Sequence, residues 1–452
     1  MVKKYLYILL NLRKKPVVQN MVMVGGITLF LKVLGFYKEM LVAASFGLSE
    51  ILDTFFIASL IPVFISNVFL GSFNNVFIPN YIAEEKSGGN IAAFQGMALT
   101  VTALVSLFFM LIAYLGTDVY VYELYPGHTP EYYQLIKTQF NYLLPCIVIW
   151  GFSALLIGLL NINNEFRYTS ISGIFIPIVI IFLILFMSGT LGSRLLAMGT
   201  LMGSALTLLF LLVLAIQKNI LKFGKPDFRN PNARLMLKQV PPKVFSGLAT
   251  GMNSVVDKFF GAQLIVGSIS ALSYAGKLPA FISGLLVISI STVLLPHFSK
   301  SILDNRERTF HNLFKMLRLV FFGTISVVII GVILSEPLIQ LFFERKEFTS
   351  EDTAIVSTIQ QAFLLYLPFS ITGMIMVNFL TSINKNAIMA YIATIAMVLN
   401  VILDYILMQY YGVLGIAICT TIVIMIKNTI MFLYIYKLHN KERDARRVNN
   451  TE

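Results

Sequence analysis

The chain has 452 residues, of which 57% are hydrophobic and only 12% are charged, whereas soluble domains carry about 25% charged residues. A surface so poor in charge excludes the soluble fold classes and predicts an integral membrane protein. The net charge of +12 would suit nucleic acid, but the basic residues are distributed as at a membrane surface, so no nucleic acid is expected as a partner.

Twelve apolar stretches follow one another along the chain, and each can form a helix that crosses a bilayer. Such a helix needs about 20 apolar residues, because the hydrocarbon core is about 30 Å thick. We expect the helices at residues 18–44, 52–78, 91–115, 138–160, 168–188, 195–217, 240–263, 267–296, 313–334, 356–382, 387–409 and 412–436. The sequence therefore predicts an all-α polytopic membrane protein.

The longest polar linker, which contains GKPDFRNPN, separates six predicted spans from the next six. The spans thus form two lobes, flanked by basic ends. The predicted organisation is a basic N-terminal segment at 1–17, a first six-helix lobe at 18–217, a linker at 218–239, a second six-helix lobe at 240–436 and a basic tail at 437–452.

Lysine and arginine lie mostly on one side of the predicted membrane. If the N-terminus is inside and the spans alternate, the inside segments hold most of the 34 basic residues. The outside loops near residues 118–131 and 336–352 are acidic instead. Because cytoplasmic loops are enriched in lysine and arginine, we expect both termini and the linker in the cytoplasm, with anionic membrane lipids as partners.

The two predicted lobes share a repeated segment. SLIPVFISNVFLGSFNNVFIP, which ends at Pro79, matches GKLPAFISGLLVISISTVLLP, which ends at Pro296, at a constant offset of 217 residues. Both segments are predicted to cross the membrane in the same direction, so the lobes are related by a pseudo-two-fold axis along the membrane normal. Transporters built from such parallel repeats place the substrate between the halves and alternate its access.

Four lysines and one aspartate of the predicted spans are candidate substrate-binding residues: Lys32, Lys38, Asp53, Lys258 and Lys277. A charge in mid-membrane costs about 2.5–3.5 kcal/mol even on the lenient insertion scale, so it faces a cavity or a partner. Lys38 and Lys258 each lie nine residues before a glycine, at matching places in the two lobes. An excess of cations in a central cavity suits an anionic substrate such as a lipid pyrophosphate.

A second interpretation of these charged residues is that they have structural roles and do not bind substrate. Lys38 and Lys258 each have a neighbouring acid, so both pairs can be solvated ends of helices. Lys277 can serve only to neutralise an acid such as Asp257 or Asp53. Lys427 is interpreted as a snorkelling or lateral contact, and Asp404 as structural.

No motif for soluble catalysis is present. The two cysteines and the four histidines have no metal-ligand spacing, and there is no glycine-rich phosphate loop or nucleophile elbow. We therefore expect no enzyme activity, no cofactor and no metal site. A coupling cation, Na⁺ or H⁺, is the one further small partner that a transporter of this kind would need.

Four stretches resemble the MurJ/MviN family of lipid II flippases, within the superfamily of multidrug and oligosaccharidyl-lipid exporters. They are KVLGFYKEMLVAASFG with LDTFFIASLIP, GSISALSYAGKLPAFISGLLVISISTVLLP, EPLIQLFFERKEFTSEDT and LTSINKNAIMAYIATIAMVLNVIL. The resemblance implies a flippase of the bacterial plasma membrane that moves a polyprenyl-pyrophosphate-linked sugar. It also implies that Lys32, Lys38 and Lys277 surround the pyrophosphate in a central cavity.

The sequence departs from the family pattern in several ways, and two of them bear most directly on the cargo. The family carries arginine at the positions of Lys32, Lys38 and Lys277, and lysine cannot bind a phosphate bidentately as arginine does. Lipid II flippases also add two spans to the twelve expected here. Two alternatives therefore stay beside lipid II: a flippase for an exopolysaccharide or O-antigen unit, and a cation-coupled exporter of small amphipathic compounds.

Overall fold

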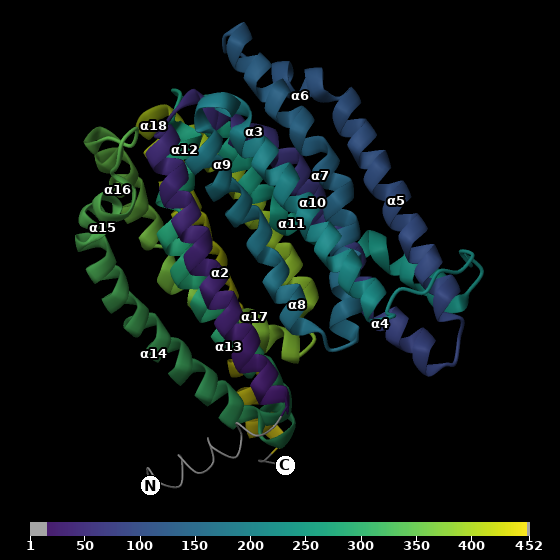
Figure 1. The fold of residues 1–452 in the computed structure, drawn as a ribbon. Helices are drawn as coiled ribbons and strands as arrows, with labels where there is room; N and C mark the ends of the chain where they lie inside the picture. Colours follow the sequence, from purple (N-terminus) through teal and green to yellow (C-terminus); the bar gives the residue numbers. More distant parts are fainter. Residues whose placement is uncertain (1–15, 450–452) are drawn as a thin grey trace. The chain divides into compact units, whose positions relative to one another are not determined.

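A computed structural model describes residues 16–449, so almost all of the predicted N-terminal segment at 1–17 lies outside the described residues. The regular structure in the described part is helical, apart from an isolated β-bridge between Arg345 and Phe348 (Figure 1). Contacts divide the chain into two compact units. Unit 1 comprises Met1–Ser45 and Thr54–Gly251, and unit 2 comprises Phe46–Asp53 and Met252–Glu452. The predicted lobe boundaries stay a prediction.

Unit 1 is a helical bundle in which α10 packs against α7 and α9, and α5 packs against α7. Its elements are α2 (Pro16–Phe46), α3 (Glu50–Ile65), the π-helix η1 (Ser66–Leu70), α4 (Gly71–Lys86), α5 (Ile91–Leu115), α6 (Thr117–Leu124), α7 (Pro130–Ile162), α8 (Phe166–Ile171), η2 (Ser172–Ile174), α9 (Phe175–Leu191), η3 (Gly192–Arg194), α10 (Leu195–Gln217) and most of α11 (Pro231–Gly261). Its core contains a group of aromatic rings in which Phe77 lies next to Phe73 and Phe94.

The first copy of the repeated segment is an irregular helix. Pro62 lies inside α3, where its ring removes one backbone N–H donor from the helix. The next turn, Ser66–Leu70, is wound as a π-helix before α4 continues. The segment thus departs from regular α-helix twice, at Pro62 and in the π turn that follows.

The linker between α10 and α11 is fastened to unit 1 by buried side chains. Gln95 donates to the carbonyl of Ile220 at 3.0 Å and accepts from the backbone N–H of Lys222 at 2.7 Å. Glu84 accepts from the side-chain amides of Asn230 and Asn232, both at 2.7 Å. Glu84 and Gln95 are almost fully buried, so the linker is an integral part of this unit.

Unit 2 is a second helical bundle, in which α17 packs against α13, α14 and α18. Its elements are the end of α11, α12 (Ser268–Ala275), α13 (Lys277–Asp304), α14 (Arg306–Ile333), α15 (Ser335–Phe343), α16 (Ser350–Leu364), α17 (Leu367–Ser382) and α18 (Asn386–Asn449). At Gly412 the backbone turns to φ 55° and ψ −134°, so α18 is two helices in succession. The sequence predicts a span boundary at this place.

Seven stretches of helix in the described residues are long and apolar enough to cross a membrane. They are Glu50–Lys86, Ile91–Leu115, Pro130–Ile162, Phe166–Gln217, Arg306–Ile333, Ser350–Ser382 and Ala387–Asp444. Two of them, Phe166–Gln217 and Ala387–Asp444, each hold two predicted spans, separated near Gly192 and Gly412. Three predicted spans fall on α2, α11 and α13, which are not among the seven. The number of twelve stays a prediction.

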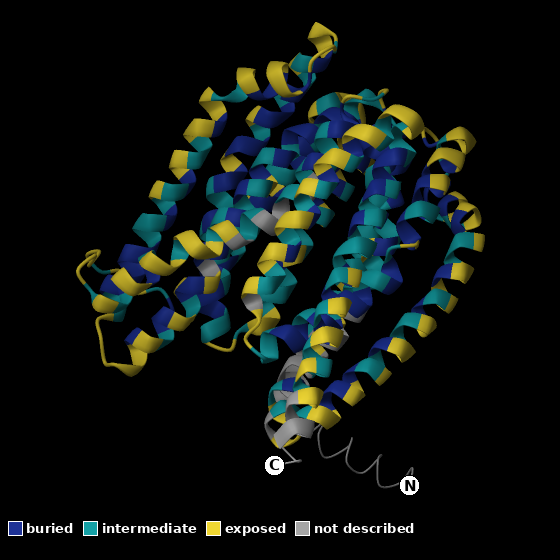
Figure 2. Cartoon of the chain, turned by 180° about the vertical axis from the view of Figure 1, so that it is seen from behind, coloured by how far each residue is buried: buried dark blue, intermediate teal, exposed yellow. Residues whose placement is uncertain are grey.

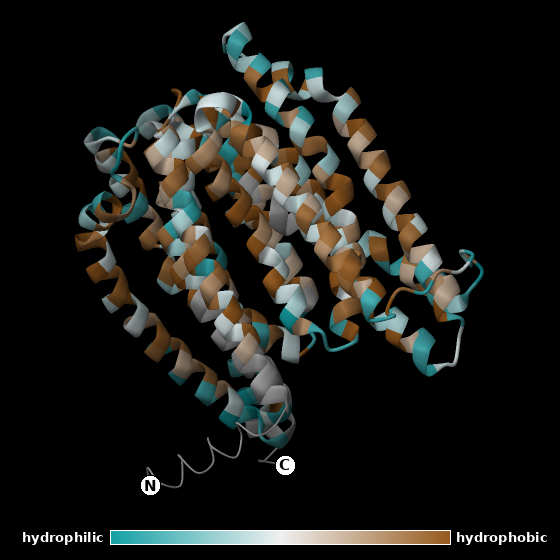
Figure 3. Cartoon of the chain, in the orientation of Figure 1, coloured by the Kyte–Doolittle hydropathy of each residue, from teal (hydrophilic) through white to brown (hydrophobic). Residues whose placement is uncertain are grey.

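The exposed faces of these helices are apolar, as lipid requires. On α14, Leu319 is 74% exposed and Ile333 is 71% exposed, and on α9 Phe186 is 73% exposed. Figures 2 and 3 show the same helices by exposure and by hydropathy: the exposed residues of α5 and α14 are largely hydrophobic, and hydrophilic residues gather near the helix ends. Soluble monomers rarely expose continuous apolar surfaces of this extent, so these faces are built for a bilayer.

Candidate functional site

The five predicted substrate-binding residues are divided between the two units. Lys32 and Lys38 lie on α2 in unit 1, whereas Asp53, Lys258 and Lys277 lie in unit 2. Within unit 2 the structure brings Lys258 and Lys277 close to one another, whereas Asp53 binds the start of α12.

Both lysines of α2 are partly buried, although the helix is strongly apolar. Lys38 Nζ lies 2.5 Å from Glu39 Oε1, and their side chains are 20% and 14% exposed. The neighbouring acid therefore balances part of the Lys38 charge, as the structural reading of this residue expects. Lys32 lies six residues earlier, about 120° away around the helix, so the two ammonium groups leave α2 on different faces.

Asp53 holds the start of α12 in unit 2. Its carboxylate accepts from the backbone N–H groups of Gly267 at 2.7 Å and Ser270 at 2.8 Å, and from the Ser270 hydroxyl at 2.5 Å. The side chain is only 2% exposed. Because the first N–H groups of a helix have no partner within it and carry positive charge, a carboxylate here is stabilising.

The opposite end of α12 leads directly to Lys277, the first residue of α13. Lys277 and Lys258 are both partly buried, and they lie near enough to repel one another electrostatically. Asp257, next to Lys258, attracts it. Unit 2 thus gathers two ammonium groups beside a short helix whose position is fixed by Asp53, and two cations together favour an anion.

The loop that carries the family-like stretch EPLIQLFFERKEFTSEDT packs against α12. The ring of Tyr274 in α12 is tilted against that of Phe343, with centroids 5.2 Å apart, and meets that of Phe348 edge-on, with centroids 5.6 Å apart. Gly47 adopts φ +55°, and a Cβ at this position would lie only 2.3 Å from the carbonyl oxygen of Glu347. Glycine is thus required where the chain between α2 and α3 meets this loop.

A second group of polar side chains, two buried and two partly buried, lies where the end of α11 meets α18. Asp257 accepts from the amide of Asn400 at 3.2 Å and from the hydroxyl of Thr420 at 3.3 Å. Asp404 lies one helical turn after Asn400, close enough to interact with Asp257. We call Asp257, Asn400, Asp404 and Thr420 the acidic cluster.

Several oxygens of the acidic cluster have no donor. Within the described residues, neither carboxyl oxygen of Asp404 has a hydrogen-bond partner, and the same holds for Asn400 Oδ1. Asp404 is 0% exposed and Asn400 1% exposed. A buried carboxylate without a partner is costly, so it must take up a proton or a cation. Carboxylate, amide and hydroxyl oxygens are the types of ligand that a hard cation binds.

Sequence reasoning assigned a structural role to Asp404 and did not connect it with Asn400 or Thr420. The available signal was the spacing of Asn400 and Asp404, four residues apart on one helical face. In the part of the chain that the structure describes, no group of three or more histidine, cysteine or acidic side chains could hold a metal ion. The oxygens of the acidic cluster suit Na⁺ or H⁺ rather than a transition metal.

Comparison with known sequences identifies the family. A model of the family described as lipid II flippase MurJ matches residues 42–447. A relative from Thermosipho africanus, named lipid II flippase MurJ, is 30% identical over 396 residues, which cover 87% of this chain and 81% of the relative. A relative from Buchnera aphidicola subsp. Baizongia pistaciae, named probable lipid II flippase MurJ, is 28% identical over 406 residues, 87% of this chain and 79% of the relative.

Solved structures agree. A lipid II flippase MurJ in the inward closed conformation superposes with a TM-score of 0.79 and 29% identity, over 92% of this chain and 87% of that one. An inward-facing MATE family transporter of the MOP superfamily has a TM-score of 0.73 at 15% identity, over 94% of this chain and 99% of that one, and shows the fold alone. The predicted all-α polytopic membrane fold and the predicted resemblance are confirmed. The chain belongs to the MurJ family.

Proposed function

We propose that this protein is a flippase that moves lipid II, a polyprenyl-pyrophosphate-linked sugar, across the bacterial plasma membrane by alternating access between its two lobes. The names of its relatives support this cargo. The single observation in this chain that carries the proposal is the pair Lys258 and Lys277, two lysines gathered beside α12 within the membrane-spanning part of unit 2. Such a pair recognises an anion, and a lipid pyrophosphate is the anion that a flippase meets there.

Within this proposal the five predicted site residues have different tasks. The four lysines, Lys258 and Lys277 in unit 2 and Lys32 and Lys38 in unit 1, are the candidate contacts of the pyrophosphate. Asp53 contributes by position: its three hydrogen bonds fix the start of α12, and the other end of α12 leads to Lys277. Asp53 is therefore a positioning residue, and the lysines are the groups that contact the substrate.

The lysines also bear on the two other cargoes. A drug exporter with cationic substrates needs carboxylates toward its cavity, and two neighbouring lysines repel such substrates. A polyprenyl-linked unit of exopolysaccharide or O-antigen shares the pyrophosphate, so the lysines recognise it equally. The two polyprenyl-linked cargoes differ in their sugar, which the lysines do not distinguish. The names of the relatives favour lipid II.

We also propose that the acidic cluster is the place of the coupling cation, Na⁺ or H⁺. Buried oxygens of Asp404 and Asn400 without donors support this assignment. The cluster joins α11 to both halves of α18, so binding a cation there would change how these helices pack. We do not expect this protein to be an enzyme, because transport by this scheme breaks no covalent bond.

Flipping of fluorescent lipid II in proteoliposomes tests the proposed function. We expect Lys277→Ala to slow flipping per folded protein roughly tenfold to a hundredfold, because charge-assisted hydrogen bonds contribute about 1.5–3 kcal/mol. Lys277→Arg should flip at near the wild-type rate. Lys427→Ala is the matched control, because Lys427 is also a partly buried lysine of unit 2 outside the proposed site. Full activity of Lys277→Ala would remove Lys277 from the substrate site.

Cysteine labelling in intact cells tests the proposed orientation, with both termini in the cytoplasm. A cysteine at Ser350, at the start of α16, should react with a membrane-impermeant maleimide from outside. A cysteine at Asn230, in the linker, should react only after the membrane is opened. The reverse pattern would invert the topology.

A further inference from the structure

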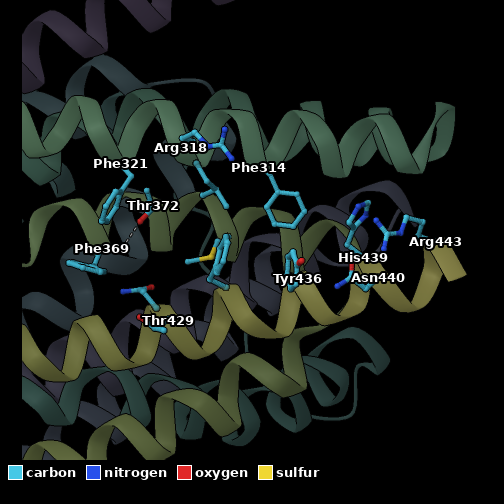
Figure 4. A pocket seen from close by; sticks show the side chains of 14 residues that line it. Phe314, Arg318, Phe321, Phe369, Thr372, Thr429, Tyr436, His439, Asn440 and Arg443 are labelled. Carbon is cyan, nitrogen blue, oxygen red and sulfur yellow. Dashed lines mark hydrogen bonds between the residues drawn. The ribbon is translucent and has the colours of Figure 1, made fainter.

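Basic and aromatic side chains occur together in a cavity of unit 2 and on the linker of unit 1. The cavity has a volume of about 560 Å³ and lies between α14, α17 and α18 (Figure 4). Its arginines, Arg318 and Arg443, lie on opposite sides of the rings of Phe314 and Tyr436, so they do not form one charged site. On the linker, residues 218–230, charges and rings share one short segment.

The linker is fastened along the first turns of α5. A Cβ on Gly224 of the linker would clash with backbone atoms of Ala92 and Ala93, and a Cβ on Gly96 would clash with the carbonyl oxygen of Gly224. Gln95, next to Gly96, bonds to the linker backbone on the N-terminal side of Gly224. Figure 1 shows the linker beside the N-terminal end of α5. The linker backbone is therefore held in place, and its exposed side chains are presented from a fixed position.

The face of α5 that the linker covers continues along the helix as a lipid-facing face. Leu107 lies eleven residues after Gly96, and at about 100° per residue the two directions differ by only about 20°. Leu107 is 46% exposed, and Leu111, one turn further, is 54% exposed. Because exposed apolar faces of such helices meet lipid, the outer side of the linker also lies toward the bilayer.

The contact with α5 also fixes the depth of the linker. The middle residue of α5 (Ile91–Leu115) is Ala103, and the contact at residues 92–96 lies seven to eleven residues before it. At 1.5 Å per residue this is about 10–16 Å from the middle of the helix, and half of a hydrocarbon core is about 15 Å. The linker therefore lies at the edge of the core. Backbone groups at such a depth need partners in the protein, and Gln95 supplies them to the linker.

The exposed side chains of the linker include two rings and several cations. Phe223 is 77% exposed and Phe228 is 44% exposed. Three further exposed side chains are basic: Lys222, Lys225 and Arg229. In the part of the chain that the structure describes, the charged groups of these three form no ion pair. Apolar rings beside cations at the edge of a bilayer are typical of a segment bound to an anionic membrane surface.

We propose that residues 222–229 of the linker dock on the anionic lipid headgroups of the leaflet at this end of α5, which is the cytoplasmic leaflet in the proposed orientation. The rings of Phe223 and Phe228 enter the layer between headgroups and acyl chains, and the three basic side chains bind lipid phosphates. The lipid surface is favoured over a soluble acidic protein, because the linker lies at the bilayer edge on the lipid-facing side of α5. Docked in this way, the segment holds the connection between α10 and α11 at a fixed depth.

Tryptophan fluorescence of the full chain in nanodiscs tests the depth of the linker. Phe223→Trp carries the probe, and the signal of the native Trp150 is subtracted with the unchanged protein. The nanodiscs contain phosphatidylcholine brominated near the headgroup, with or without phosphatidylglycerol. We expect bromine to quench Phe223→Trp about threefold more strongly than the control Lys441→Trp. Lys441 is exposed and lies 29 residues after Gly412, about 43 Å along α18 and beyond a core of about 30 Å.

The charges are tested with the same probe. Phosphatidylglycerol should increase the quenching of Phe223→Trp about twofold, and the triple variant Lys222→Gln, Lys225→Gln and Arg229→Gln should abolish this increase. The matched control removes three exposed charges from α14 and α18 and should keep it: Arg308→Gln, Lys315→Gln and Lys437→Gln.

Phe228→Trp gives a second probe position if Phe223→Trp folds poorly. Quenching at these two positions no stronger than at Lys441→Trp would place the linker in water and overturn the proposal in favour of a soluble partner. An increase with phosphatidylglycerol that survives in the linker triple variant would overturn the role of the basic side chains. Nanodiscs present the same lipids on both faces, so these outcomes depend neither on the orientation of the chain nor on transport, and they leave the proposed function untouched.

Discussion

Asp53 and Asp404 are both buried carboxylates of unit 2, and they differ in their surroundings. Asp53 accepts three hydrogen bonds from the start of α12. Asp404 is buried as deeply, yet within the described residues neither of its carboxyl oxygens meets a donor. A carboxylate that is fully bonded by the protein stabilises the fold. One that is left without donors inside the same unit is available to an ion, so hydrogen bonding separates the structural acid from the candidate functional one.

The largest effect on stability should come from Asp53→Ala. It removes all three hydrogen bonds to a charged acceptor and leaves buried N–H groups of α12 without a partner, which should lower the free energy of unfolding by about 3 kcal/mol or more. Thermal unfolding of the detergent-purified protein measures this loss. Asp118→Ala is the control, because Asp118 is 74% exposed in its ion pair with Lys137 and such pairs contribute about 0–1 kcal/mol. Equal losses of unfolding free energy in both variants would show that the buried, hydrogen-bonded carboxylate stabilises the protein no more than the exposed one.

Asp404→Asn should abolish binding of the coupling ion without destabilising the ion-free protein. We expect Na⁺ at a hundredfold excess over its dissociation constant to stabilise the wild type by about 2.7 kcal/mol, and the variant to lose this gain. Without Na⁺ the variant should be as stable as the wild type or more so, because it removes a buried charge that has no donor. The measurement is unfolding temperature against NaCl, with KCl at equal ionic strength. If H⁺ is the coupling ion, the gain appears on lowering the pH instead, and stabilisation by neither ion contradicts the assignment.

Glu84→Ala tests a third buried carboxylate, in unit 1. Asn230 and Asn232 both donate to it, so this carboxylate, like that of Asp53, is hydrogen-bonded by the protein. We expect a loss of about 1–3 kcal/mol and easier proteolysis of the linker after α10. Limited trypsin digestion at the linker basic residues, with Glu85→Ala at the next position as control, measures it. An unchanged digestion pattern would show that the linker is held by Gln95 alone.

Thr420→Val should have the smallest effect on the fold. Its hydroxyl donates to Asp257 at a long 3.3 Å, and also to the carbonyl of Ile416, so the loss in unfolding free energy should stay below about 1 kcal/mol. If Thr420 is a cation ligand, the dissociation constant for Na⁺ should nevertheless rise several-fold. Thr421→Val is the neighbouring control, because its hydroxyl bonds to Ala362 instead. A larger rise in the control would place the cation elsewhere.

The fold could be predicted because long apolar stretches and loop charges report on the membrane directly. The span boundary near residue 412 coincides with the break at Gly412, and Asp53 was singled out as a charge within a span. The acidic cluster was not predicted, because Asp257 lies 143 residues before Asn400 and each residue taken alone has an ordinary structural explanation.

The bond between Asp53 and Ser270 has a consequence for symmetry. The two residues are 217 positions apart, which is the offset of the predicted repeat, so they hold equivalent places six residues before its two quoted copies. In a two-fold arrangement, counterparts meet only where the axis passes. Two separate identical chains would have to present the same residue there, either two carboxylates that repel or two serines without an anion. A single chain that contains both copies can carry an acid in one copy and its hydrogen-bond donor in the other. It can therefore form a hydrogen bond between equivalent positions that a symmetric dimer of identical chains could not form.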